Sequence, residues 1–154
     1  MGFPRELLDA ARVLYQVEDE TQGTLRRSIS TAYYALFHLH IESGCQNWPE
    51  RQRSKVARQF EHKRMKEVSA TIARRYAKSG VPAEQDLCLV ANTFAELQEK
   101  RHEADYDLGV TLSLFDVEET ITFVEDAFVS WERIKNHSLA QDYLYSLLFK
   151  DRVS

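Results

Sequence analysis

Apolar residues recur at spacings of three and four along almost the whole chain, and this helical periodicity is the strongest constraint on the fold. The pattern is clearest over residues 7–15, 25–41, 56–76 and 87–97. We find no internal repeat and no alternating strand pattern of useful length. With only 5 Gly and 3 Pro, the chain has too few turn residues for an all-β protein. The sequence predicts an all-α, up-and-down bundle of five or six helices.

Start and stop signals give the expected helix boundaries, at about 4–19, 25–43, 49–78, 83–103, 116–135 and 139–149. Thr24 can cap the second helix and Gly44 can end it, while Asp116 and Glu119 have the spacing of a capping box. Residues 136–138 either break or kink the last segment. Its final part is apolar all round, so it must enter the core or contact another chain, and we favour self-association.

Length and composition describe one ordinary soluble domain. The 154 residues are enough for a single domain over 1–154 and too few for two. No run of 18 apolar residues predicts a membrane span, and the N-terminus lacks the pattern of a secretory signal. The two cysteines, Cys45 and Cys88, form no metal motif and suit inert thiols in a reducing cytoplasm. Because common metal, phosphate-loop and nucleophile motifs are missing, we expect no metal and no cofactor.

A basic segment is hidden by the overall net charge of −4. Residues 50–80 contain ten Lys or Arg and three acidic residues, so this segment carries +7 in a chain whose remainder carries −11. Such a segment is a footprint for a polyanion, a solvated helix face, or a face that pairs with acidic surface on the same or a second chain. If the partner is RNA, the residues expected to contact phosphates are Arg51, Arg58, Arg64 and Arg74.

Arg101 stands where helical spacing expects an apolar residue, after the stripe formed by Leu87, Val90, Phe94 and Leu97. A guanidinium on a packing face is costly unless it is paired or faces a cleft. Asp105 is four residues further on, and periodicity alone favours an ordinary Arg101–Asp105 ion pair at a helix end. The alternative is that Arg101 lies at a subunit junction, where its planar set of donors could bind a phosphate.

Two segments resemble known motifs. The stretch Arg26–His38 (RRSISTAYYALFH) resembles the arginine, tyrosine and histidine helix of HEPN-domain proteins. The stretch Arg101–Tyr106 (RHEADY) resembles the later arginine motif of the same superfamily. Its form is similar to an uncharacterised bacterial branch related to the HEPN partners of minimal nucleotidyltransferases. The residues that support the two motifs are Arg27, Tyr34, His38 and Asp105.

The resemblance implies a helical bundle that usually dimerises and, in active members, a metal-independent RNase of toxin or defence type. Two copies of an arginine and histidine motif then face each other across one cleft. Carried over, Arg101 matches the arginine and His102 the polar position. The expected histidine is replaced, since Tyr106, Asp107 and Leu108 stand in its place. We therefore take Arg101, His102 and Tyr106 as the candidate catalytic residues.

RNA cleavage by its own 2′-hydroxyl needs a base for that proton and positive charge on the phosphate. Arg101 can supply the charge. His102 has a suitable pKa, but neighbouring helical residues point about 100° apart. Tyr106, with an ordinary pKa of about 10, is a poor base at pH 7. His38 is a third candidate if its helix contacts the Arg101 helix.

Tyr106 has two further interpretations. It is a possible nucleotidylation site, by analogy with related toxins that are silenced in this way, or it packs at a dimer junction with its hydroxyl bonded.

Three functions follow as hypotheses. The first is an RNA-directed homodimer, toxin-like or defence-associated, in which Arg101 from both chains lines a cleft and the basic helix guides RNA. The second is a non-catalytic interaction module that binds a partner protein, such as a nucleotidyltransferase or an antitoxin. The third is a nucleotide or small-molecule sensor that uses the same cleft.

Overall fold

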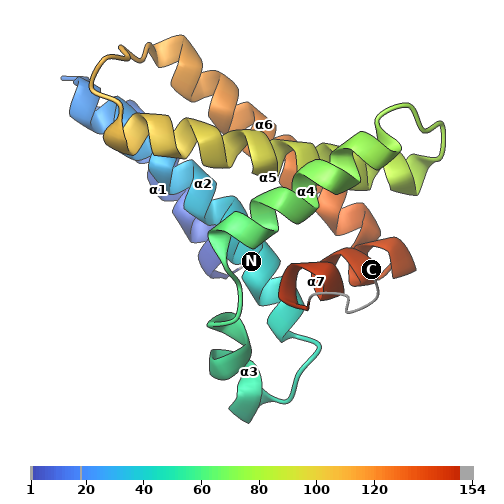
Figure 1. Cartoon of the computed structure of the whole chain (residues 1–154). Coiled ribbons are helices and arrows are strands. Elements are labelled where there is room, and N and C mark those ends of the chain that lie inside the picture. Colours follow the sequence, from blue (N-terminus) through green and yellow to red (C-terminus); the bar gives the residue numbers. More distant parts are fainter. Residues whose placement is uncertain (1, 18, 150–154) are drawn as a thin grey trace.

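Seven α-helices make up the fold in this computed structural model, which describes residues 2–17 and 19–149 (Figure 1). No strand occurs in these residues, so the prediction of an all-α bundle is confirmed. The helix number exceeds the five or six expected. The helices are α1 (Phe3–Tyr15), α2 (Gln22–Cys45), α3 (Glu50–Ala57), α4 (His62–Tyr76), α5 (Pro82–Tyr106), α6 (Leu114–Ile134) and α7 (Ser138–Leu148).

The extra helix arises because the single helix predicted over residues 49–78 is wrong. The chain leaves α3 after Ala57 and enters α4 at His62, and between them the buried Phe60 turns toward α2. A Cβ atom on Gly44 would lie 2.6 Å from the Phe60 ring, so the ring packs where Gly44 has no side chain. Gly44 therefore lies within the last turn of α2, where it leaves room for Phe60. The helix continues to Cys45, so the expected role of Gly44 as the residue that ends it is wrong.

Two helix starts lie three residues before the expected caps. Thr21 is the N-cap of α2, since its hydroxyl accepts from the Thr24 N–H at 3.2 Å and the Thr24 hydroxyl oxygen accepts from the Thr21 N–H at 2.9 Å. Ser113 and Asp116 form the same reciprocal capping box at the start of α6. In both cases the residue predicted as the cap is the second member of the box.

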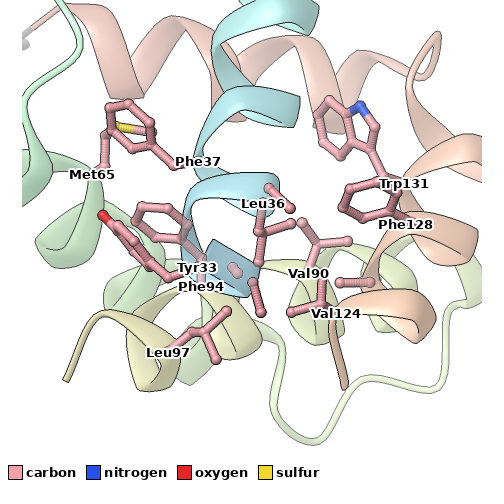
Figure 2. Close-up of a cluster of buried hydrophobic side chains, with 14 of the residues drawn as sticks. Tyr33, Leu36, Phe37, Met65, Val90, Phe94, Leu97, Val124, Phe128 and Trp131 are labelled. Atoms are coloured by element: carbon pink, nitrogen blue, oxygen red, sulfur yellow. The ribbon is translucent and has the colours of Figure 1, made fainter. Parts of the chain in front are cut away.

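The long helix α2 lies at the centre of the bundle, packed against α1, α5 and α6 (Figure 1). Its buried face is wide. Figure 2 shows Tyr33, Phe37 and Met65 on one side of α2 and Phe128 and Trp131 on the other. One side therefore contacts side chains of α4 and α5, and the other packs against α6.

The apolar α7 enters the core of its own chain. It packs on α4, α2 and α5 and buries Ala140, Tyr143, Leu144 and Leu147. Arg64 of α4 holds its end, since its Nη2 donates to the Ser146 carbonyl at 2.8 Å and also to the Phe149 carbonyl. Of the two outcomes expected for this segment, entry into the core is observed, while self-association through exposed side chains such as Tyr145 stays a prediction.

Within the described part of the chain, no helix has both the length and the apolar character needed to span a bilayer.

Candidate functional site

The Arg101 side chain lies over two tyrosine rings at the contact between α5 and α2. Its guanidinium carbon is 5.2 Å from the centre of the Tyr33 ring and 5.9 Å from that of Tyr34. The side chain is 13% exposed, and its Nη1 is 3.5 Å from Oδ2 of Asp105. The Nε atom is buried and has no hydrogen-bond partner among the described residues. The ion pair favoured by the sequence is present, yet it leaves donor capacity on the guanidinium unused.

Two polar side chains of α2, Arg26 and Ser30, hold the C-terminal end of α5. Arg26 donates to the carbonyls of Ala104 at 3.0 Å and Asp107 at 2.9 Å, and also to that of Val110. These contacts neutralise the carbonyl end of α5, where positive charge is favourable. One turn further along α2, the Ser30 hydroxyl is 3.4 Å from Oδ2 of Asp105. The α2 edge thus orients the helix end that carries Arg101.

His62, which the sequence did not single out, completes the site from α4. Its Nδ1 is 2.6 Å from the Tyr33 hydroxyl, and its ring stacks on Phe37 with centroids 4.3 Å apart. Burial raises the pKa of the Tyr33 phenol, against the opposing charge of Arg101, so the hydroxyl stays protonated and can donate to Nδ1. The neutral His62 ring then carries its hydrogen on Nε2.

His38 lies near the Tyr34 ring of the tyrosine pair. Its ring centre is 6.5 Å from that of Tyr34 and 4.9 Å from that of Phe3, which it meets edge-on. Burial lowers the pKa of His38. Burial also lowers the pKa of His62, with smaller contributions from the charges of Arg101 and His38. Both imidazoles are therefore uncharged at neutral pH, the form that can accept a proton.

We call Arg101, Tyr33, Tyr34, His38 and His62 the Arg101 cluster. It combines a fixed positive charge, an unpaired buried N–H and two neutral imidazoles on three different helices. A guanidinium with spare donors binds oxyanions, and a neutral imidazole moves protons. The arrangement can hold an anion and accept a proton beside it.

The other two catalytic candidates lie on the exposed side of α5. The rings of His102 and Tyr106 contact each other, with centroids 4.9 Å apart, and Tyr106 is 65% exposed. Nucleotidylation of Tyr106 stays a prediction, and so does its packing at a dimer junction.

Exposed apolar side chains continue from Tyr106 across the α5–α6 connection. Leu108 is 91% exposed and Phe115 is 68% exposed. These exposed side chains are close together in the sequence, and we call them the Tyr106 patch: Tyr106, Leu108, Leu114 and Phe115. A gathering of large apolar side chains on a surface is typical of an interaction site.

The structure separates the basic residues into two groups. Arg51, Arg58 and Arg74 are exposed, as is Arg27 of the α2 motif. Arg64 instead bonds carbonyls at the end of α7, which gives it a structural task. The sequence grouped these residues by charge and could not distinguish the roles.

Among the described residues, no group of three or more His, Cys, Asp or Glu side chains is arranged to hold a metal ion. Comparisons of the chain with protein-family models, curated proteins and solved structures found no match. The interpretation of the site therefore rests on its own geometry.

Proposed function

We propose that this chain is an RNA-directed protein of the HEPN type that cleaves RNA without a metal ion at the Arg101 cluster. The observation that carries the proposal is the largely buried Arg101 guanidinium, with its unpaired Nε, over the Tyr33 and Tyr34 rings. The Tyr33 hydroxyl bonds His62, and His38 adjoins the Tyr34 ring. The guanidinium suits a phosphate, and an imidazole suits the adjacent 2′-hydroxyl. RNA is the nucleic acid that supplies both groups on one nucleotide.

The reaction assigns a separate task to each side chain. Neutral His38 takes the proton of the 2′-hydroxyl, because the Tyr33 hydroxyl already occupies Nδ1 of His62. The 2′-oxygen then attacks phosphorus and the bond from phosphorus to the 5′-oxygen breaks. The leaving 5′-oxygen takes a proton from water, and His38 returns its own proton to water. The products are a 2′,3′-cyclic phosphate and a 5′-hydroxyl.

Arg101 stabilises the charge that grows on the phosphate oxygens during this reaction. His62 can donate its Nε2–H to the same oxygens without carrying a net charge. Tyr33 and Tyr34 hold the guanidinium in place through their ring faces.

The working unit in this proposal is a homodimer. The Tyr106 patch begins one turn beyond Arg101 and exposes large apolar side chains that a second copy would cover. Covering it would place two Arg101 clusters near one junction. The same patch supports the alternative function, in which a partner protein such as a nucleotidyltransferase or an antitoxin occupies it and the chain does not cut RNA.

Incubation of the purified protein with a mixed RNA pool in EDTA, followed by end-group analysis, tests the proposal. We expect fragments that end in 2′,3′-cyclic phosphate and begin with a 5′-hydroxyl. Arg101→Ala should slow cleavage by about 10²- to 10³-fold, as expected for the loss of one group that stabilises transition-state charge. Arg133→Ala is the matched control, because Arg133 pairs with Asp86 away from the cluster.

Equal cleavage by Arg101→Ala and the unchanged chain would disprove the assigned site. Light scattering decides between the two occupants of the Tyr106 patch. A dimer that Phe115→Glu separates into monomers supports the homodimer. A wild-type monomer that does not cleave RNA supports the interaction module.

A further inference from the structure

We propose that a pocket beside the Arg101 cluster binds one unpaired RNA base, so that the chain acts on single-stranded RNA. The pocket has a volume of about 280 Å³ and lies between the start of α1, the later part of α2 and α3. Its lining includes Phe3, His38, Glu42, Arg53, Ser54 and Ala57. This inference rests on the proposed function, because it takes the phosphate of the same RNA to lie at Arg101.

The pocket walls offer both kinds of contact that a base needs. Phe3 is 51% exposed and presents an aromatic ring on which a base can stack. Glu42, Ser54 and Arg53 are also among the lining residues, and side chains of these types can pair with the polar edge of a base. Arg53 is held at this rim, since its Nε donates to the Trp48 carbonyl at 3.0 Å.

His38 joins the pocket to the Arg101 cluster. It lines the pocket, and its ring centre is 4.9 Å from that of Phe3. Its ring is also near that of Tyr34, which lies under Arg101. A nucleotide with its phosphate near Arg101 would therefore have its sugar near His38 and its base near Phe3. This is the order of groups that the cleavage reaction requires.

The position of the pocket also indicates how part of the basic segment, helix α3, would contact RNA. The α3 helix buries none of its residues, and Figure 1 shows it at the end of the bundle, apart from the α4–α5 pair. It carries Arg51, Arg53 and Lys55 against the single acid Glu50. The RNA chain on either side of the bound base can lie along this positively charged surface. A paired base cannot turn into such a pocket without unpairing, so the site selects single strands.

Fluorescence anisotropy with three labelled probes tests the proposal in EDTA. The first probe is an eight-residue uridine strand with 2′-fluoro sugars, which cannot be cleaved through a 2′-hydroxyl. The second is the abasic strand of equal length, and the third is a duplex. We expect the base-containing strand to bind at least tenfold more tightly than the other two. Equal affinity for the base-containing and abasic strands would overturn the base pocket.

Two variants address the pocket from different sides. Phe3→Leu keeps an apolar side chain against His38 but removes the stacking ring, and it should weaken binding of the base-containing strand about tenfold. Ala57→Trp fills the space and should remove the preference for bases. Phe123→Leu, at an exposed phenylalanine on α6, is the matched control and should change nothing. Unchanged binding by both pocket variants would contradict the proposal.

Arg101→Ala separates the failure of this inference from the failure of the proposed function. If Arg101 binds phosphate, this change weakens binding of all three probes. If all three probes bind with equal affinity and Arg101→Ala weakens each of them, only the proposed base pocket is disproved. A wild-type protein that binds none of them would remove both proposals.

Discussion

Two histidines in this bundle bond to tyrosine hydroxyls, but their surroundings differ. His40 is 1% exposed, with Nδ1 at 2.8 Å from the Leu36 carbonyl and Nε2 at 3.0 Å from the Tyr143 hydroxyl. That hydroxyl is in turn 2.7 Å from the hydroxyl of Ser69. His62 makes its bond to Tyr33 at the half-buried end of α4, next to Arg101.

The difference lies in the hydrogen-bonding capacity that each group keeps. In the His40 network, Nδ1–H donates to a carbonyl, Tyr143 donates to Nε2, and the Ser69 hydroxyl can donate to Tyr143. The polar groups of His40, Ser69 and Tyr143 are therefore all used in hydrogen bonds that link α2, α4 and α7. In the Arg101 cluster, the Nε of Arg101 has no partner among the described residues. A histidine–tyrosine pair thus indicates a ligand site only where donors or acceptors remain free.

The largest expected effect is acid destabilisation through His40. Burial lowers the pKa of His40 to about 4, from an ordinary value of about 6.5. Between these two values the unfolded chain binds a proton that the folded chain does not, so stability falls as pH falls from 6.5 to 4 and levels off below. The loss through this one group is roughly 3 kcal/mol. Urea unfolding at pH 7.5 and pH 4.5 measures it, and an NMR titration of His40 near 6.5 would contradict it.

Removal of the same hydroxyl from each pair sharpens the comparison. Tyr143→Phe leaves His40 Nε2 and the Ser69 hydroxyl without their buried partner, which should cost about 2 to 3 kcal/mol. Tyr33→Phe should cost less than about 1 kcal/mol, because water can reach the half-buried His62. Urea unfolding measures both variants at one pH. Equal decreases in the free energy of unfolding would show that the two histidine–tyrosine pairs stabilise the fold equally.

Two neighbouring arginines of the α2 motif provide a smaller contrast. Arg26→Ala removes the donor to the carbonyl end of α5 and should cost about 1 to 2 kcal/mol. Arg27→Ala, at an exposed position, should stay within about 0.5 kcal/mol of the unchanged chain. Thermal unfolding compares the two. A larger loss for Arg27→Ala would mean that the α2 edge does not hold the Arg101 helix as described.

The smallest expected effect concerns the salt dependence of the proposed RNA binding. Replacing the exposed Arg51, Arg58 and Arg74 with glutamine should reduce the slope of log affinity against log salt by up to about 2, since each phosphate contact contributes about 0.7. Arg64→Gln is the contrast, because it should loosen α7 and leave the slope almost unchanged. An unchanged slope in the triple variant would exclude these arginines from RNA binding.

Local patterns were sufficient for the helical class and for part of the site. The four-residue spacing of Arg101 and Asp105 predicted the ion pair that the structure contains, because side chains four apart in a helix are neighbours. The stretch Arg26–His38, which the sequence singled out as a motif, supplies the edge of α2 that faces the site through Arg26, Ser30, Tyr34 and His38. The break before α4 escaped prediction, because Phe60 fits the helical stripe equally well whether or not the helix continues.

The sequence by itself determined the all-α class, most of the helices and the neighbours within each helix, since these depend on residues three and four apart. Only the tertiary structure decided that Phe60 packs against Gly44, and the resulting turn brings His62 to Tyr33 across 29 positions of the chain. It also committed His40 to the core and kept His38 beside a pocket. Such contacts follow from how whole helices pack, and no local spacing encodes them.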